Sequence, residues 1–188
     1  MRPMTARLQP LTAPFEPEIA ESLRRLMGPI EAEPLALFRT IAHHPALLER
    51  FRQTGSTLLS FGRLPDADRE TIIHRTTARC GAAYEWGVHA VTFAAALGLD
   101  ERWLSATWNG DPDDFADPGQ ALLVRFADEL HDTATVGDAT WAALRERYDD
   151  AQLVELVCLA GFYHLVSYVC RAFAVAPEPW AAAAPPAT

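Results

Sequence analysis

Apolar positions recur along most of the chain at steps of three and four residues, the spacing of one face of an α-helix. Clear stripes of this kind lie in 141–148 and 153–160, and no run of alternating β-branched residues suggests a strand. The pattern predicts an all-α fold. We expect about eight helices, at 17–27, 34–43, 45–61, 66–80, 83–97, 101–108, 118–132 with 138–148, and 150–174.

Proline and glycine separate these segments at helix-length intervals. Pro45 and Pro118 suit the first turn of a helix, where a missing backbone N–H costs nothing. Gly62 and Gly98 stand where a left-handed residue would end a helix. The punctuation therefore supports the helical boundaries predicted from periodicity.

A length of 188 residues suits a single domain over 1–188 with a sizeable core. Residues 1–14 carry three prolines and no clear period, so we expect an arm there. The Pro/Ala-rich stretch 177–188 predicts a flexible tail or a strap that contacts a partner.

Charge and residue usage exclude several classes of function. The net charge is −9 and no basic run occurs, so binding to nucleic acid or to an anionic membrane surface is not expected. All 16 basic residues are arginine, which excludes Schiff-base chemistry, pyridoxal phosphate anchoring and a phosphate-loop lysine. The G-x-G-x-x-G fingerprint of dinucleotide binding is also missing from the sequence.

Cysteine usage and hydropathy bear on the compartment. Cys80, Cys158 and Cys170 match neither a disulfide framework nor a C-x-x-C pair. The N-terminus lacks the apolar stretch of a signal peptide, which predicts a cytoplasmic protein. The most apolar stretch, 156–170, is shorter than the ~20 residues needed to span a bilayer, so it predicts a buried helix.

The densest set of polar and reactive residues lies in 70–89. Glu85 and His89 are four residues apart, so they share one face of a helix that continues as apolar through Phe93. Such a pair on a buried face either shifts its pKa values, as in a general acid/base site, or locks two helices together as a structural pair. The spacing alone leaves both interpretations open.

The other histidines carry weaker signals. His164 lies midway along the most apolar helix and needs a hydrogen-bond partner there, which makes it a candidate site residue. His74 follows Glu70 by four residues and suggests a surface pair, and His131 near a helix end is expected to be solvated.

A metal site is conceivable from Glu70, Glu85, His89 and His164. Carboxylate bundles repeat Glu-x-x-His on two helices, whereas Glu85 and His89 have the longer spacing Glu-x-x-x-His, so no metal is expected. Cys80 beside Arg79 is either a reactive thiol or a small core residue.

Three strings carry a family resemblance: Leu64-Pro-x-x-x-Arg69-Glu70, then Cys80-Gly-x-x-Tyr84-Glu85-Trp86-Gly-x-His89, and Gly161-Phe-Tyr-His164. Over roughly 35–175 the sequence resembles the carboxymuconolactone decarboxylase family, whose superfamily includes the alkylhydroperoxidase D-like (AhpD-like) proteins. The string Tyr-Glu-Trp-x-x-His is the most specific part. The resemblance implies an AhpD-like helical bundle whose chains form homo-oligomers.

The sequence departs from the alkylhydroperoxidase branch at its dithiol. In that branch a Cys-x-x-Cys ends four residues before the histidine, and a glutamate upstream joins a proton relay. Here Ala82 and Glu85 hold the two cysteine positions, while Glu70 matches the relay glutamate. Because Cys80 alone cannot close an intramolecular disulfide, peroxide reduction by the dithiol route is not expected.

The resemblance then favours the decarboxylase branch, which works without metal or organic cofactor. It implies that Glu70, Glu85 and His89 are catalytic. Arg75 or Arg79 could bind a substrate carboxylate, although either could be a solvated helix charge. The residues expected to bind substrate are Tyr84, Trp86, Cys80 and His164.

The function expected is a cofactor-independent acid/base lyase or isomerase acting on a small unsaturated carboxylate or lactone. Two alternatives stay open. One is an alkylhydroperoxidase-like antioxidant with peroxiredoxin-type activity at Cys80, and the other is a non-catalytic oligomeric binding protein.

Overall fold

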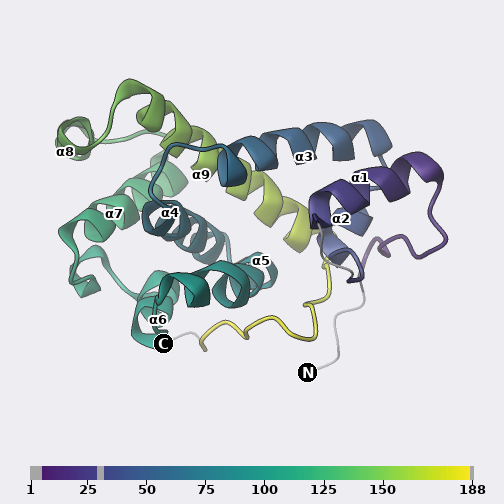
Figure 1. Cartoon of the computed structure of the whole chain (residues 1–188). Coiled ribbons are helices and arrows are strands. Elements are labelled where there is room, and N and C mark those ends of the chain that lie inside the picture. The colour runs from purple at the N-terminus through teal and green to yellow at the C-terminus, as the bar shows by residue number, and fades with distance from the viewer. Residues whose placement is uncertain (1–5, 29–31, 187–188) are drawn as a thin grey trace. The chain divides into compact units, whose positions relative to one another are not determined.

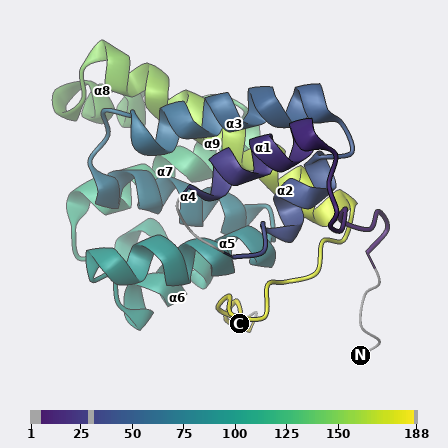
Figure 2. The same cartoon turned by 45° about the vertical axis from the view of Figure 1, so that its right-hand side comes forward.

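The computed structural model describes residues 6–28 and 32–186, and within those ranges the secondary structure is entirely helical. The all-α class predicted from the sequence is confirmed. Nine α-helices lie in these ranges (Figures 1 and 2): α1 Pro17–Met27, α2 Ala36–Ile41, α3 Pro45–Ser60, α4 Asp66–Arg79, α5 Ala83–His89, α6 Glu101–Asn109, α7 Pro118–Thr133, α8 Asp138–Arg147 and α9 Asp150–Ala172.

The helix boundaries differ from expectation in two places. The stretches 118–132 and 138–148 are separate helices, α7 and α8. The helix predicted over 83–97 changes form after His89, into a π-helical turn at Ala90–Ala94 and a 3₁₀ turn at Ala95–Leu97. Such π turns are rare in proteins overall, but many of those that occur lie at functional sites.

The capping predictions had a mixed outcome. Pro45 and Pro118 open α3 and α7 as expected. Gly98 ends the 3₁₀ turn with φ 70°, in the left-handed region. The prediction for Gly62 was wrong, because α3 ends at Ser60 with Phe61 as its C-cap at φ −122°, and Gly62 is not in the left-handed region.

The chain packs as two compact units. The first comprises the residues up to Gly62 together with Val169–Pro179, and it contains α1, α2 and α3. Helices α1 and α2 both pack on α3, and Leu23, Leu37 and Leu48 are fully buried within this unit.

The described part of the predicted arm, residues 6–14, is held to the first unit by hydrogen bonds. The Arg7 backbone N–H donates to the Phe173 carbonyl at 2.8 Å. Leu11 and Arg39 are joined twice, once between backbones at 3.2 Å and once from the Arg39 guanidinium at 3.0 Å. The arm is therefore an extended segment with backbone partners.

The second unit comprises Arg63–Tyr168 with the segment that begins at Trp180. Helix α4 is its centre and packs against α5, α6 and α7, with α5 and α6 below it in both views (Figures 1 and 2). Besides Ile72 and Ile73, α4 buries Glu70, His74 and Arg75, whose polar groups need partners inside the unit. The candidate site lies where these buried polar groups of α4 meet their partners. The single domain predicted over 1–188 stays a prediction.

The segment 180–186 of the predicted tail contacts α5 and α6 in the second unit. The Ala182 backbone N–H donates to the Gly87 carbonyl at 3.2 Å, and the Asn109 side chain donates to the Pro186 carbonyl at 3.0 Å. A Cβ atom on Gly87 would lie 2.1 Å from the Ala182 carbonyl oxygen, so this crossing requires glycine. The flexibility expected of the tail stays a prediction.

Helix α9 is 23 residues long, close to the helix predicted over 150–174, and it extends beyond the apolar stretch 156–170. By length and composition it could cross a membrane, but half of its most apolar window is buried in the structure. Leu156, Leu159 and Tyr163 are among its fully buried side chains. Core helices of this kind pass the same length test, so the helix is itself weak support for a membrane span.

Candidate functional site

The centre of the candidate site is a buried ion pair between α4 and α5. The Nδ1 atom of His89, in the last turn of α5, lies 2.8 Å from the Glu70 Oε2 atom on α4. Glu70 is 0% exposed and His89 is 3% exposed. Because a carboxylate only accepts, Nδ1 carries the proton of this hydrogen bond.

The other ring nitrogen of His89 faces two further polar groups. Its Nε2 atom lies 3.0 Å from the Tyr163 hydroxyl on α9 and 3.5 Å from the Glu85 Oε1 atom, one turn back on α5. The ring also lies against Phe93, with centroids 4.7 Å apart. His89 is thus held between two carboxylates and a phenol in an otherwise apolar setting.

This setting raises the pKa of His89 to about 9. Burial alone would lower that pKa, but the charge and hydrogen bond of Glu70, together with Glu85, outweigh it. Burial would likewise raise the pKa of Glu70, yet the charge and hydrogen bond of His89 hold it below its ordinary value. At neutral pH the pair is therefore imidazolium and carboxylate, and His89 is a proton donor.

His74 belongs to the same buried cluster, which corrects its interpretation as part of a surface pair. It is 0% exposed, and its Nδ1 atom donates to the Glu70 backbone carbonyl at 2.9 Å. Burial, and then the positive charge of His89, lower the pKa of His74 to about 4. His74 is therefore neutral and adds no second positive charge beside Glu70.

Several buried polar atoms of the cluster make no hydrogen bond within the described chain. They are Glu70 Oε1, Glu85 Oε2, His74 Nε2 and Arg69 Nε, the last lying 3.6 Å from Glu70 Oε1. Buried polar groups are nearly always paired with protein, water or ligand. Glu70 Oε1 and Glu85 Oε2 therefore each have capacity to accept a hydrogen bond from a water or a small polar ligand.

Comparison with solved structures identifies the fold. An uncharacterized peroxidase-related protein from Silicibacter sp. TM1040 matches with TM-score 0.78 and 17% identity, over 95% of this chain and 94% of that one. The debrominase Bmp8 matches with TM-score 0.76 and 14% identity, over 94% and 95%. The alkylhydroperoxidase AhpD core, an uncharacterized peroxidase-related protein from Ralstonia eutropha JMP134, matches with TM-score 0.68 and 17% identity, over 93% and 95%.

The chain has the AhpD-like helical fold. The AhpD-like helical bundle expected from the sequence is confirmed as the fold, while membership of the superfamily and of its Tyr-Glu-Trp-x-x-His subgroup stays a prediction. No model of a known protein family matches the sequence, and no curated protein sequence matches it significantly.

The AhpD-like fold brings Glu70, Glu85 and His89 together, and their catalytic roles stay predictions. It adds Tyr163, which sequence reasoning missed in favour of the adjacent His164. Tyr163 is 1% exposed, and burial, followed by the charges of Glu85 and Glu70, raises the pKa of its hydroxyl well above the ordinary value. Its hydroxyl therefore stays protonated.

The predicted substrate-binding residues of α5 are buried in the fold. Trp86 is 2% exposed and its indole N–H donates to the Thr107 hydroxyl at 3.1 Å. Tyr84 is 4% exposed. Their roles in substrate binding stay predictions.

Arg75 and Arg79, the two arginines considered for substrate binding, are both paired with carboxylates. Arg75 makes two hydrogen bonds to Asp128, at 2.6 and 2.7 Å, and two more to the carbonyls of Thr107 and Gly110. Arg79 pairs with Asp132 at 2.5 Å. Arg75 thus joins α4 to α7 and to the end of α6.

Cys80 and His164, two other predicted site residues, lie in a second cluster. There His131 Nδ1 lies 3.1 Å from His164 Nε2 and 3.9 Å from the Cys80 sulfur. The hydrogen bonds of His164 go to His131, Cys80 and the Ala160 carbonyl and not to the acid–base residues. The expectation that His131 is simply solvated was wrong, because it is half-buried in these contacts.

The hydrogen bond from Cys80 raises the pKa of His164 despite its partial burial. Burial, then the charges of Arg79 and His164, lower the pKa of His131. The two imidazoles therefore differ in basicity although they are in contact.

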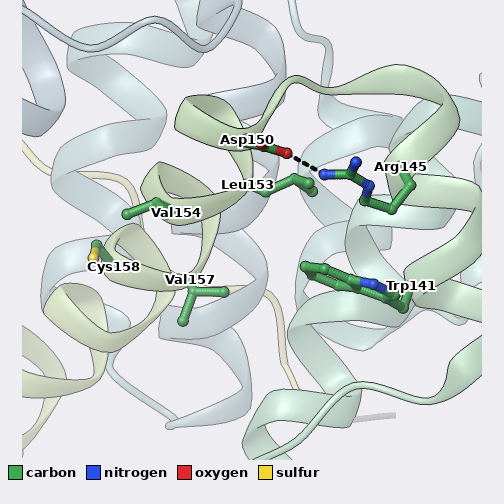
Figure 3. A pocket seen from close by; sticks show the side chains of 7 residues that line it. All are labelled: Trp141, Arg145, Asp150, Leu153, Val154, Val157 and Cys158. Carbon is green, nitrogen blue, oxygen red and sulfur yellow. Dashed lines mark hydrogen bonds and ion pairs between the residues drawn. The ribbon is translucent and has the colours of Figure 1, made fainter.

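A surface pocket of about 400 Å³ lies between α8 and α9 (Figure 3). Figure 3 shows Trp141 and Arg145 on one side and residues of α9 on the other, with Arg145 paired to Asp150. The pocket contains none of the predicted site residues. It is lined by Trp141, Arg145, Asp150, Leu153, Val154, Val157 and Cys158.

Proposed function

We propose that the protein is an acid–base enzyme, a lyase or isomerase acting on a small unsaturated carboxylate or lactone without a cofactor. The supporting observation is the buried Glu70–His89 pair at 2.8 Å, with Glu85 3.5 Å from the far side of the imidazolium. A buried proton donor with a carboxylate beside it is what proton transfer to or from carbon requires.

In the decarboxylation form of this reaction, His89 donates a hydrogen bond to the conjugated carbonyl. The electron pair of the C–CO₂⁻ bond moves into the conjugated system as CO₂ leaves, and the imidazolium stabilises the charge that develops on oxygen. The resulting carbanion equivalent takes one proton at carbon, supplied by way of His89 or a protonated Glu85. In the isomerase form, Glu85 removes a proton from one carbon and returns it at another.

The test measures loss of conjugated absorbance and release of CO₂ with a panel of unsaturated lactone acids. Substituting His89→Gln or Glu85→Gln should lower kcat/KM by ~10²–10⁴-fold, the usual contribution of a positioned acid or base. Cys80→Ser should leave turnover unchanged. Folded His89→Gln and Glu85→Gln variants that turn over as well as the wild type would overturn the proposal.

A thiol-dependent antioxidant role is a second candidate, supported by the two imidazoles beside Cys80. A Cys80 thiolate would attack a peroxide oxygen, releasing alcohol and leaving a sulfenic acid that an external thiol reduces. Peroxide consumption that requires added thiol and is lost in Cys80→Ser would favour this role. The same activity in Cys80→Ser would exclude it.

The non-catalytic alternative assigns Glu70 and His89 a structural role. Unfolding of both the His89→Gln and Glu85→Gln variants, with no ligand that shifts the wild-type melting temperature, would favour it.

We also propose that the chain forms a homo-oligomer and acts in the cytoplasm. Several apolar side chains of α9 are exposed, including Val154, Val157, Leu165 and Tyr168. Val154 and Val157 line the surface pocket together with Trp141 of α8. Exposed apolar surface of this extent commonly marks a protein–protein contact. A second copy of the chain is the partner proposed for this α9 surface.

A further inference from the structure

We propose that Cys80, His131 and His164 form a binding site for one zinc ion per chain. The three side chains come from different helices of the second unit, at the end of α4, in the last turn of α7 and midway along α9. One ligand atom of each lies within 4.8 Å of the other two. The site shares no residue with the Glu70–His89 pair.

The distances fit the edges of a tetrahedron around zinc. With Zn–N bonds of about 2.0–2.1 Å and a Zn–S bond of about 2.3 Å, two nitrogens lie about 3.4 Å apart and nitrogen and sulfur about 3.6 Å apart. The observed edges are 3.1 Å between His131 Nδ1 and His164 Nε2, and 3.9 Å between His131 Nδ1 and the Cys80 sulfur. Shifts of a few tenths of an ångström would bring these two edges to tetrahedral values, and the third edge, from His164 to the Cys80 sulfur, is at most 4.8 Å.

The tautomer of His164 is already fixed for metal binding. Its Nδ1 atom lies 3.0 Å from the Ala160 carbonyl oxygen, which only accepts, so Nδ1 carries the proton and Nε2 presents its lone pair to the cluster. A backbone carbonyl behind a ligating imidazole is the usual outer-shell arrangement of zinc sites.

The donor set selects the kind of ion. One thiolate and two imidazoles suit zinc and other borderline or soft transition metals, whereas magnesium and calcium require oxygen ligands. Binding converts the Cys80 thiol to a thiolate and releases one proton, while the proton on His131 moves to its other ring nitrogen. Three protein ligands leave the fourth position to water or a small anion.

The electrostatic surroundings do not oppose a cation. Arg79 is the nearby positive group, and it pairs with Asp132 at 2.5 Å and lies 3.6 Å from Asp128. These carboxylates offset its charge. The half-exposed imidazoles also give an ion a path into the site from solvent.

The test uses the full-length protein, freed of metal by a chelator and titrated with zinc against a colorimetric competitor. We expect one ion per chain. Cys80→Ser and His164→Ala should each weaken zinc binding more than ~100-fold, since even outer-shell changes cost ~10–100-fold. Cys158→Ser is the matched control, because Cys158 is an exposed cysteine of α9 outside the cluster, and it should bind zinc as the wild type does.

Cobalt(II) provides a second readout that is independent of variant folding. The wild-type protein with Co²⁺ should show a sulfur-to-metal charge-transfer band and the strong visible bands of a tetrahedral ion, and Mg²⁺ should produce no change. Several outcomes would overturn the proposal: no stoichiometric binding, equal binding by folded Cys80→Ser, loss of binding in Cys158→Ser, or an octahedral cobalt spectrum without sulfur.

Discussion

The Glu70 carboxylate lies 2.8 Å from the His89 imidazole although 19 positions separate the two residues in the chain. The contact joins the central helix α4 to α5 inside the second unit and lies against Tyr163 of α9. Side chains of three helices therefore meet at one charged hydrogen bond. The protonation of His89 depends on the Glu70 carboxylate, which is 0% exposed to solvent.

The first prediction concerns the origin of the raised pKa of His89. Replacing Glu70 with Gln removes the larger of the two charges that offset burial, so the pKa of His89 should fall well below about 9. An NMR titration of the His89 ring protons measures this directly. Glu101→Gln, at an exposed position of α6, is the control and should leave the titration unchanged. An unshifted His89 in Glu70→Gln would show that Glu70 is not the cause.

The second prediction concerns stability at alkaline pH. The pKa of His89 is about 9 in the folded protein and near 6.5 in the unfolded chain, so its protonation stabilises the fold fully below about pH 6.5. That contribution should disappear as the pH rises through 9. Urea unfolding from pH 6 to 10 should show a decline in the free energy of unfolding, and the decline should be smaller in His89→Gln. Equal slopes in both proteins would contradict the assignment.

A third prediction concerns Arg75, whose four hydrogen bonds make it structural. Arg75→Met removes both hydrogen bonds that Arg75 donates to the Asp128 carboxylate, and breaking a largely buried ion pair in this way should lower the free energy of unfolding by ~3–5 kcal/mol. Arg24→Met removes an exposed ion pair with Glu21 and should change stability little. Chemical denaturation of the two variants compares them. If the Arg75→Met protein were as stable as the Arg24→Met protein, Arg75 would have no structural role.

The fourth prediction tests the α9 surface as a contact between copies. Val157 is 44% exposed, and Val157→Asp should shift the protein toward the monomer in light scattering because it places a charge in an apolar contact. Leu47, 52% exposed on α3, provides the control substitution Leu47→Asp, which should leave the mass unchanged. The proposal fails if the wild type is already monomeric or if Val157→Asp keeps its mass.

The helices were predictable because their signals are local. Periodicity needs only neighbouring residues, and prolines such as Pro45 and Pro118 mark starts without reference to the rest of the chain. The change of winding after His89 was not predictable, because an apolar stripe continues across a π turn almost unchanged. The extent of α9, predicted as 150–174, followed from the same local signals.

The candidate site was predictable in part. Glu85 and His89 followed from a spacing of four, and Glu70 followed from the family resemblance. The choice between Tyr163 and His164 could not be made, because adjacent residues on a helix point about 100° apart and the rotation of α9 is set by packing. The pairing of Cys80 with His131 joins residues 51 apart, which no local pattern encodes.

The crossing of Ala182 over Gly87 ties two distant positions of the sequence together. A carbonyl oxygen occupies the space where any side chain on Gly87 would begin, 2.1 Å from its Cβ. The two positions should therefore covary among divergent homologues. Homologues with a larger residue in place of Gly87 must have a different path for the C-terminal segment. Homologues without that segment no longer need glycine at this position.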